Sequence, residues 1–133
     1  MSLEIMIVDD EKDITFTVKS GLENFDDQMK VIEINDGFEC LKLLSEGKIP
    51  DLILIDIMMP RMNGWELVNR IKENNEWKKI PLIFLTAKTD DFSKTFGKTI
   101  TQDFIEKPFD IKELHERILR VFRKINESLP HLE

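Results

Sequence analysis

Polar and charged side chains follow several short apolar stretches of this chain. They are Asp9, Asp10 and Glu11 after the first stretch, Asp56 after a second, Thr86 at the end of a third, and Lys107 after the last. Carboxylates that lie close together repel one another, which raises some of their pKa values and costs stability. A divalent cation removes that cost, and Mg²⁺ prefers hard oxygen ligands while keeping several waters. If folding gathers these residues, the sequence predicts a Mg²⁺ site with Lys107 as a second positive charge.

The same residues also have ordinary structural explanations. The acids at 9–11 precede a helical pattern and suit the cap and first turn of a helix. Asp56 can simply start a loop, Thr86 is a good strand residue, and Lys107 is ordinarily a solvated cation. Only their convergence on one pocket favours chemistry over these explanations.

Converged on one pocket, these residues suit phosphoryl transfer. An aspartate can act as a nucleophile and form an aspartyl phosphate. Catalysis of that step is mainly positioning, together with cations and hydrogen-bond donors near the phosphoryl oxygens. In this interpretation Asp56 supplies the attacking oxygen, while Thr86 and Lys107 supply the donors.

Short apolar stretches alternate with helical patterns along the chain. Strands are predicted at residues 4–8, 31–34, 52–55, 82–85 and 104–105, and helices at 14–25, 38–44, 64–74 and 111–125. A further helix between 90 and 101 has the weakest signal, because its Thr and Gly residues have low helix propensity. Residues 52–55 (LILI) are nearly all aliphatic, as expected for a central parallel strand covered on both faces.

Five strand–helix units in a row predict an α/β fold. The expected architecture is a single flavodoxin-like, doubly wound domain, with a five-stranded parallel sheet in the order 2-1-3-4-5 and five helices. In such open sheets, ligands bind at the carboxyl ends of the strands, near the point where the strand order reverses. The polar residues named above all lie at such ends, so the topology predicts that they converge.

Composition narrows the classes of function. The chain has 133 residues, 41% of them apolar and 34% charged, which is the balance of a soluble globular domain. Its net charge of −7 disfavours direct binding to nucleic acid or to an acidic membrane surface. No apolar run is long enough to cross a membrane, and the first residues show no signal peptide. Arg117, Arg120, Arg123 and Lys124 are interpreted as a solvated helix face. Cys40 is the only cysteine, which favours a cytoplasmic location.

Four segments resemble those of response-regulator receiver domains in two-component phosphorelay signalling. They are IMIVDDE at 5–11, DLILIDIMMPRMNGWEL at 51–67, IPLIFLTA at 80–87 and FIEKPF at 104–109. The resemblance spans residues 4–126 and leaves 127–133 as a C-terminal tail. It implies a domain that accepts a phosphoryl group from a histidine kinase or a phosphotransfer protein in a Mg²⁺-dependent reaction. Such a domain promotes only its own phosphorylation and dephosphorylation, and controls a partner, unknown here.

The resemblance also assigns roles to individual residues. Asp56 is the implied phosphoacceptor, and Thr86 and Lys107 contact the phosphoryl group. The implied metal ligands are Asp9, Asp10, Asp56 and the backbone carbonyl of Met58. Of these, Asp10 is a direct ligand and Asp9 acts through water or orientation. The Lys107–Pro108 bond matches a cis peptide of the family.

Thr86 and Phe104 are the implied switch residues. Phosphorylation should draw the Thr86 hydroxyl toward the phosphoryl group and vacate space for the Phe104 ring. The face formed by the fourth helix, fifth strand and fifth helix would then change, biasing a partner or a homodimer. Glu113 and Arg117 lie one helical turn apart on that face. They could pair across such a dimer or, equally well, within the helix.

Met58 and Lys88 flank the expected path of the water that hydrolyses the aspartyl phosphate. The Met58 thioether holds water poorly, and Lys88 could cover the path, so a long-lived phosphoprotein is expected.

Three alternative functions stay open. A flavin- or nucleotide-binding protein of this fold would need a Gly-rich first turn instead of acids. A phosphatase with an Asp nucleophile would need an acid where Met58 stands. A degenerate receiver would serve only as an interaction module.

Overall fold

The computed structural model describes residues 2–88 and 90–128. Along the chain the elements are β1 (Leu3–Val8), α1 (Lys12–Phe25), β2 (Met29–Ile34), α2 (Gly37–Ser45), β3 (Leu52–Ile55), α3 (Gly64–Glu73), β4 (Leu82–Thr86), α4 (Asp91–Ile100), β5 (Asp103–Glu106) and α5 (Ile111–Ser128). The strands form one parallel sheet in the order β2-β1-β3-β4-β5, which confirms the predicted fold class. The helix α5 includes Glu127 and Ser128, which the sequence assigns to the tail; residues 129–133 of that tail lie outside the described residues.

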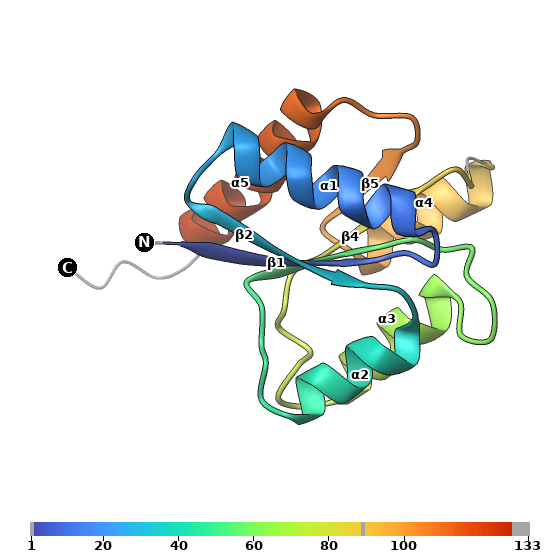
Figure 1. The fold of residues 1–133 in the computed structure, drawn as a ribbon. Helices are drawn as coiled ribbons and strands as arrows, with labels where there is room; N and C mark the ends of the chain where they lie inside the picture. The colour runs from blue at the N-terminus through green and yellow to red at the C-terminus, as the bar shows by residue number, and fades with distance from the viewer. Residues whose placement is uncertain (1, 89, 129–133) are drawn as a thin grey trace.

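Helices cover both faces of the sheet, with α1 and α5 side by side on one face and α2 and α3 on the other (Figure 1). Alternate strand residues point to opposite faces, so Ile5 and Ile7 join the core under α1 and α5, and Met6 and Val8 join the core under α2 and α3. Every residue of β3 is buried, as its LILI sequence predicts for a central strand. Among the described residues, no helix combines the length and hydropathy needed to span a bilayer.

The helix α4 forms over ten residues despite its weak sequence signal. Its N-cap is Asp90, whose carboxylate accepts hydrogen bonds from the Ser93 backbone N–H (2.9 Å) and hydroxyl (2.8 Å). The backbone hydrogen bond from Ser93 is the largest cause that lowers the pKa of Asp90, to about 2. In the middle of the helix, Gly97 lies so close to the Phe104 ring that a Cβ there would meet Phe104 Cδ2 at 2.6 Å. A cap and a tertiary contact therefore offset the poor helix propensity.

Cys40 lies in the core under α2 and is fully buried. Burial raises the pKa of its thiol to about 12, so the thiolate is not formed at neutral pH. The interpretation of Cys40 as a small packed side chain, rather than a reactive thiol, agrees with this environment.

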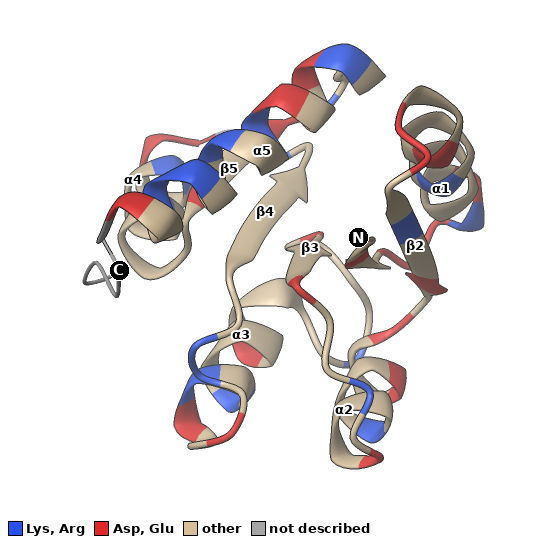
Figure 2. Cartoon of the chain, turned by 90° about the vertical axis from the view of Figure 1, so that its left-hand side faces the viewer, with Lys and Arg blue, Asp and Glu red and all other residues tan. Residues whose placement is uncertain are grey.

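The prediction that Arg117 lies on a solvated face is wrong. Its guanidinium binds Asp103 with two hydrogen bonds, of 2.8 and 2.7 Å, and also donates to the Phe104 carbonyl at 3.2 Å. The Glu113 carboxylate lies 3.5 Å from the Arg117 guanidinium in the same helix, so these two residues pair within the helix. The more exposed Arg123 binds Glu116 at 2.9 Å. Acidic and basic residues are thus interspersed along α5 (Figure 2), with more basic than acidic residues in the helix.

The Asp103–Arg117 pair is expected to make stability depend on pH. Burial raises the pKa of Asp103, but the hydrogen bonds from Arg117 and from the Phe104 N–H lower it more, so the net pKa lies below 3.8. Because the folded-state pKa is depressed, this stabilisation is present above pH 3.8 and is lost as the pH falls through the folded pKa. Asp103→Asn should therefore lower the free energy of unfolding by about 1–2 kcal/mol at pH 7.

Urea unfolding of Asp103→Asn and wild type between pH 7 and pH 3 measures this difference. The matched control is Glu116→Gln, which removes a carboxylate from an exposed pair and should cost at most about 0.5 kcal/mol. A difference for Asp103→Asn that stays constant down to pH 3 would contradict the assignment.

Candidate functional site

The carboxylates of Asp9, Asp10 and Asp56 meet at the carboxyl edge of the sheet. They converge because β1 and β3 are neighbours, with Val8 opposite Ile55, so the residue after each strand reaches the same point. One carboxylate oxygen from each of the three aspartates lies within 4.8 Å of the others. Asp9 is fully buried, Asp56 is 4% exposed and Asp10 is exposed. The predicted convergence of these acids is confirmed.

Lys107 reaches the same cluster from the end of β5. Its Nζ lies 2.6 Å from Asp9 Oδ2, 3.8 Å from Asp56 Oδ2 and 3.9 Å from Glu11 Oε1. The ammonium is therefore hydrogen-bonded to Asp9 and stands beside Asp56 without a direct hydrogen bond to it. The Lys107–Pro108 peptide is cis, as the sequence predicts.

Burial is the main influence on the ionisation of Asp9. It raises the pKa of this carboxyl and outweighs the hydrogen bonds from Lys107 and from the Glu11 N–H, which lower it. The nearby charge of Asp56 raises the pKa of Asp9 further. The cluster is thus a place where additional positive charge would favour the ionised carboxylates.

Thr86 and Phe104, the predicted switch residues, occupy neighbouring strands and are both buried, at 0% and 3% exposure. Thr86 Oγ1 accepts a hydrogen bond from the Lys88 N–H at 3.2 Å. The Phe104 ring already packs inward, edge-on to Phe84 at 6.1 Å and against Gly97. The ring therefore needs no vacated space to become buried, and the switch itself stays a prediction.

Met58 and Lys88 differ in their relation to the cluster. Met58 donates its backbone N–H to Asp56 Oδ1 at 3.4 Å, and its side chain is exposed. Lys88 Nζ binds Asp90 at 3.3 Å, which holds it at the N-cap of α4. Both residues line one hollow together with Ile57 and Trp65, and Asp56 is not among its lining residues. Of the two, Met58 is the better placed to affect water near Asp56.

Other residues also shape the site, and of these the sequence indicates only Gly64, which matches the loop after Asp56 in the receiver-domain resemblance. A Cβ on Gly64 would lie 2.5 Å from the Asp56 carbonyl oxygen, so the loop after β3 closes onto the backbone of Asp56 itself. In the same loop, Arg61 has a positive φ of 65° and binds Asp36 at 2.9 Å. The side chain of Asn35 donates to the Asp9 carbonyl oxygen at 3.0 Å. The contacts of Arg61 and Asn35 join residues that follow different strands, and no local sequence pattern marks them.

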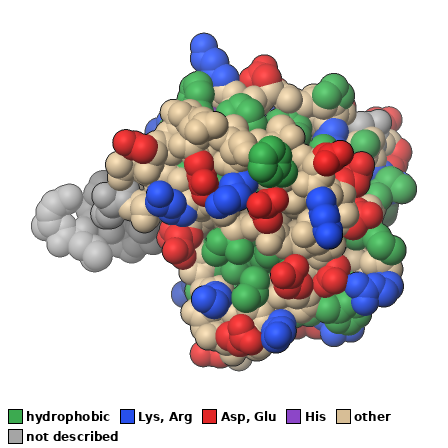
Figure 3. Space-filling model, in the orientation of Figure 1, with side chains coloured by type: hydrophobic (Ala, Val, Ile, Leu, Met, Phe, Trp, Pro, Cys, Tyr) green, Lys and Arg blue, Asp and Glu red, His purple; other side chains and the backbone are tan. Residues whose placement is uncertain are grey.

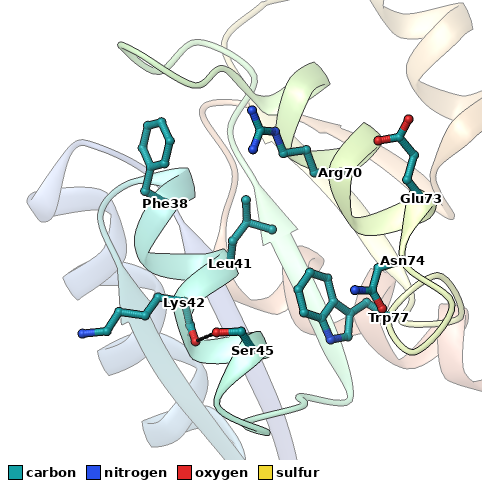
Figure 4. Close-up of a pocket in the computed structure, with 8 residues that line it drawn as sticks. All are labelled: Phe38, Leu41, Lys42, Ser45, Arg70, Glu73, Asn74 and Trp77. Atoms are coloured by element: carbon teal, nitrogen blue, oxygen red, sulfur yellow. Dashed lines mark hydrogen bonds between the residues drawn. The ribbon is translucent and has the colours of Figure 1, made fainter.

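A groove between α2 and α3 lies apart from the acid cluster. Leu41 and Trp77 face each other across it, with Arg70 and Glu73 along the α3 side (Figure 4). None of the aspartates at the sheet edge lines this groove. On the face seen in Figure 3, basic and acidic side chains are interspersed, with no continuous basic patch. The acid cluster is therefore the feature that combines charge, burial and convergence.

The donor set of the cluster fits Mg²⁺. Three carboxylates and nearby backbone carbonyls are hard oxygen ligands, and one exposed aspartate leaves room for the waters that Mg²⁺ keeps. Lys107 is already hydrogen-bonded to Asp9, which leaves Asp10 and Asp56 as the carboxylates most available to a cation.

Comparison with known proteins agrees with this geometry. Residues 5–119 match the family model described as response regulator receiver domain. The alkaline phosphatase synthesis transcriptional regulatory protein PhoP of Bacillus subtilis is 32% identical over 134 residues, covering 100% of this chain and 54% of PhoP. Protein PilG of Pseudomonas aeruginosa is 35% identical over 113 residues, covering 84% of this chain and 82% of PilG.

Solved structures give the same result. The chemotaxis protein CheY4 of Vibrio cholerae superposes with a TM-score of 0.81 and 28% identity, covering 91% of this chain and 99% of CheY4. The chain spans about half the length of PhoP, so the activity of that whole protein is not carried over. Because the family model covers most of the chain and the described fold agrees, the chain belongs to the family of response regulator receiver domains.

Proposed function

We propose that Asp56 is the phosphoacceptor of this receiver domain and that a histidine kinase or phosphotransfer protein is its donor. The observation that carries this proposal is a nearly buried Asp56 carboxylate with an aspartate cluster on one side and the Lys107 ammonium 3.8 Å away. The test is the gain of one phosphoryl group in the intact mass after treatment with a small phosphodonor and Mg²⁺, with Asp56→Asn as the negative variant.

Chemically, a carboxylate oxygen of Asp56 attacks the phosphorus of a phosphohistidine. The new P–O bond forms as the P–N bond breaks, and the imidazole leaves with the electron pair and takes up a proton. Lys107 and the Thr86 hydroxyl donate to the phosphoryl oxygens as charge develops on them. Mg²⁺, when bound by Asp10, Asp56 and the Met58 carbonyl, supplies further positive charge to those oxygens. Asp9 orients Lys107, to which it is bound at 2.6 Å.

The proposed output is a change on the face formed by α4, β5 and α5. Thr86 ends β4, which pairs with β5, and Phe104 lies in β5 against α4, so a movement of the Thr86 hydroxyl would take place next to that face. A partner or a second copy of the chain would respond to it. Arg117 is already bound to Asp103 within the chain, so it must exchange partners to pair across a dimer.

Signalling, rather than turnover of external substrates, is the proposed role. A phosphatase with an Asp nucleophile needs an acid two residues further on, and Met58 stands there. We also propose that the domain spans residues 4–126. Its proposed location is the cytoplasm, where the buried thiol of Cys40 stays reduced.

Mg²⁺ should stabilise the unphosphorylated protein through Asp10. Binding to the folded state alone raises the free energy of unfolding by mass action, by about 1.4 kcal/mol at roughly ten times Kd. Thermal unfolding across a Mg²⁺ titration measures this effect. Asp10→Ala should abolish the response, whereas Asp13→Ala, which removes an exposed acid in the first turn of α1, should leave it intact. An unchanged response in Asp10→Ala would mean that the metal binds elsewhere.

The aspartyl phosphate should be long-lived because of Met58. An Asn at this position could orient the attacking water, and one such contact, of about 1–1.5 kcal/mol, changes the rate about tenfold. Met58→Asn is therefore expected to speed loss of phosphate about tenfold. Lys88→Ala should have less effect, because Lys88 is bound to Asp90. Decay of purified phosphoprotein measures both, and equal decay of Met58→Asn and wild type would refute the expectation.

A further inference from the structure

The carboxylate of Asp10 is exposed and makes no hydrogen bond or ion pair with any other described residue. Asp9, by contrast, binds Lys107 and the Glu11 N–H through its side chain. No side-chain contact orients Asp10, so the position of its backbone decides whether its carboxylate can reach the cluster with Asp56. Contacts that fix the backbone of Asp9 therefore help to place both acids.

The backbone of Asp9 is held on both sides by residues at the end of β2. The Asp9 N–H donates to the Ile34 carbonyl at 3.0 Å, as the continuation of the parallel ladder. The Asp9 carbonyl oxygen accepts a hydrogen bond from Asn35 Nδ2 at 3.0 Å. Because a carbonyl oxygen can only accept, the amide of Asn35 must turn its NH₂ group toward Asp9. Strand pairing supplies one contact, and the Asn35 side chain supplies the other.

Asn35 is itself held by a buried hydroxyl. Its Nδ2 also donates to Thr15 Oγ1 at 3.3 Å. The Thr15 hydroxyl in turn has two acceptors for its one hydrogen, Glu33 Oε1 at 3.0 Å and the Lys12 carbonyl at 3.1 Å. Thr15 is fully buried in α1, so this hydroxyl sits in one place. Donation to either acceptor polarises the hydroxyl, which makes the Thr15 oxygen a better acceptor for the amide. The chain from Glu33 through Thr15 to Asn35 thus ends on the backbone of the acid pair.

We propose that Asn35 is a positioning residue for the Asp9–Asp10 acid pair, acting through the Asp9 carbonyl and supported by Thr15. Its consequence is a higher Mg²⁺ affinity, since metal affinity falls when the groups that orient the ligands are removed. The inference rests on the proposed function, because it presupposes that Asp10 binds Mg²⁺. It adds a residue outside the carboxylate cluster, 26 positions from Asp9 along the chain.

The primary test measures the dissociation constant for Mg²⁺ alone, without phosphodonor, from backbone amide chemical shifts. Asn35→Ala should weaken binding about tenfold. Asn35→Asp keeps the size of the side chain but replaces the donor with an oxygen that repels the Asp9 carbonyl. Extra negative charge by itself would tighten Mg²⁺ binding, so weaker binding by Asn35→Asp is expected only if positioning dominates. Asn69→Ala, which removes an exposed amide on α3, is the matched control.

A graded pair of variants tests the support from Thr15. Thr15→Val removes the hydroxyl at constant shape and should weaken Mg²⁺ binding by about threefold, less than Asn35→Ala. Thr15→Ser retains the hydroxyl and should bind like wild type. Urea unfolding without Mg²⁺ is measured in parallel, since a purely structural role would lower stability and leave the dissociation constant unchanged. At saturating Mg²⁺, the rate at which a small phosphodonor phosphorylates these variants should return to within about twofold of the wild-type rate. The reason is that the substitutions alter the Mg²⁺ affinity and not the chemistry.

The outcomes separate the inference from the proposed function. If Asn35→Ala binds Mg²⁺ as tightly as wild type, or Asn35→Asp binds it more tightly, the positioning role is overturned and the proposed function stands. Absence of any Mg²⁺ binding by wild type overturns both. Weaker binding in both Asn35 variants, with Asn69→Ala and Thr15→Ser like wild type, supports the inference.

Discussion

Replacing Gly64 with Ala is expected to lower the free energy of unfolding by about 3 kcal/mol, because overpacked positions that cannot relax are costly. The added Cβ would lie 2.5 Å from the Asp56 carbonyl oxygen, 2.7 Å from Ile57 Cα and 3.0 Å from the Asp56 carbonyl carbon. All three are backbone atoms, so no side chain can swing away. The backbone of Asp56 must shift, and phosphorylation should be impaired together with stability.

Gly47→Ala is the matched control for this variant. Gly47 has a positive φ of 87° but nothing within 4 Å of its virtual Cβ, so its cost is the strain of the left-handed conformation alone, about 1 kcal/mol. Urea unfolding and the extent of phosphorylation are measured for both variants. Equal stability losses, or full phosphorylation of Gly64→Ala, would contradict the claim that this glycine lets the loop close onto the phosphoacceptor.

The fold could be predicted because its strongest signals are local. An aliphatic run such as LILI in β3 can be satisfied only by a strand covered on both faces, and alternation with helical patterns then implies parallel pairing. The strand order reverses next to β1, which brings the acids that follow β1 and β3 together. Residue type, spacing and topology were therefore sufficient for the acid cluster.

Features that depend on tertiary contacts were not predictable in the same way. The helix α4 has low propensity, and its stability relies on the Asp90 cap and on the Phe104 ring packed against Gly97. From the sequence, Arg117 resembles the other exposed cations of its helix. Only the fold shows that β5 places Asp103 beside it. Asn35 follows β2, and nothing in the sequence there indicates a role for its amide. The role becomes visible only in the fold, where the amide lies within hydrogen-bond distance of the Asp9 carbonyl.

The inward position of Phe104 also follows from packing rather than from residue type. An aromatic residue three positions before Lys107 suggests a ring that moves, but not where it rests. In the structure the ring is buried between Phe84 and Gly97. A glycine in the middle of α4 creates the space, and no signal in β5 itself reveals it.

Replacing Asp56 with Asn is expected to abolish stoichiometric phosphorylation. The amide keeps the size of the side chain but lacks the anionic oxygen that attacks phosphorus. Asp9 is also buried beside Lys107, but its carboxylate is already bound to that ammonium at 2.6 Å. The matched control is Asp51→Asn, at the opposite end of the same strand, where the carboxylate accepts a hydrogen bond from the Glu4 N–H at 2.7 Å. Asp51→Asn should be phosphorylated like wild type.

Intact mass after incubation with a small phosphodonor and Mg²⁺ tests the central claim most directly. Wild type and Asp51→Asn should each gain the mass of one phosphoryl group, and the gain should disappear when Mg²⁺ is chelated. Asp56→Asn should keep its unmodified mass throughout. An Asp56→Asn protein that gains one phosphoryl group to the same extent as wild type would show that the phosphoacceptor lies elsewhere.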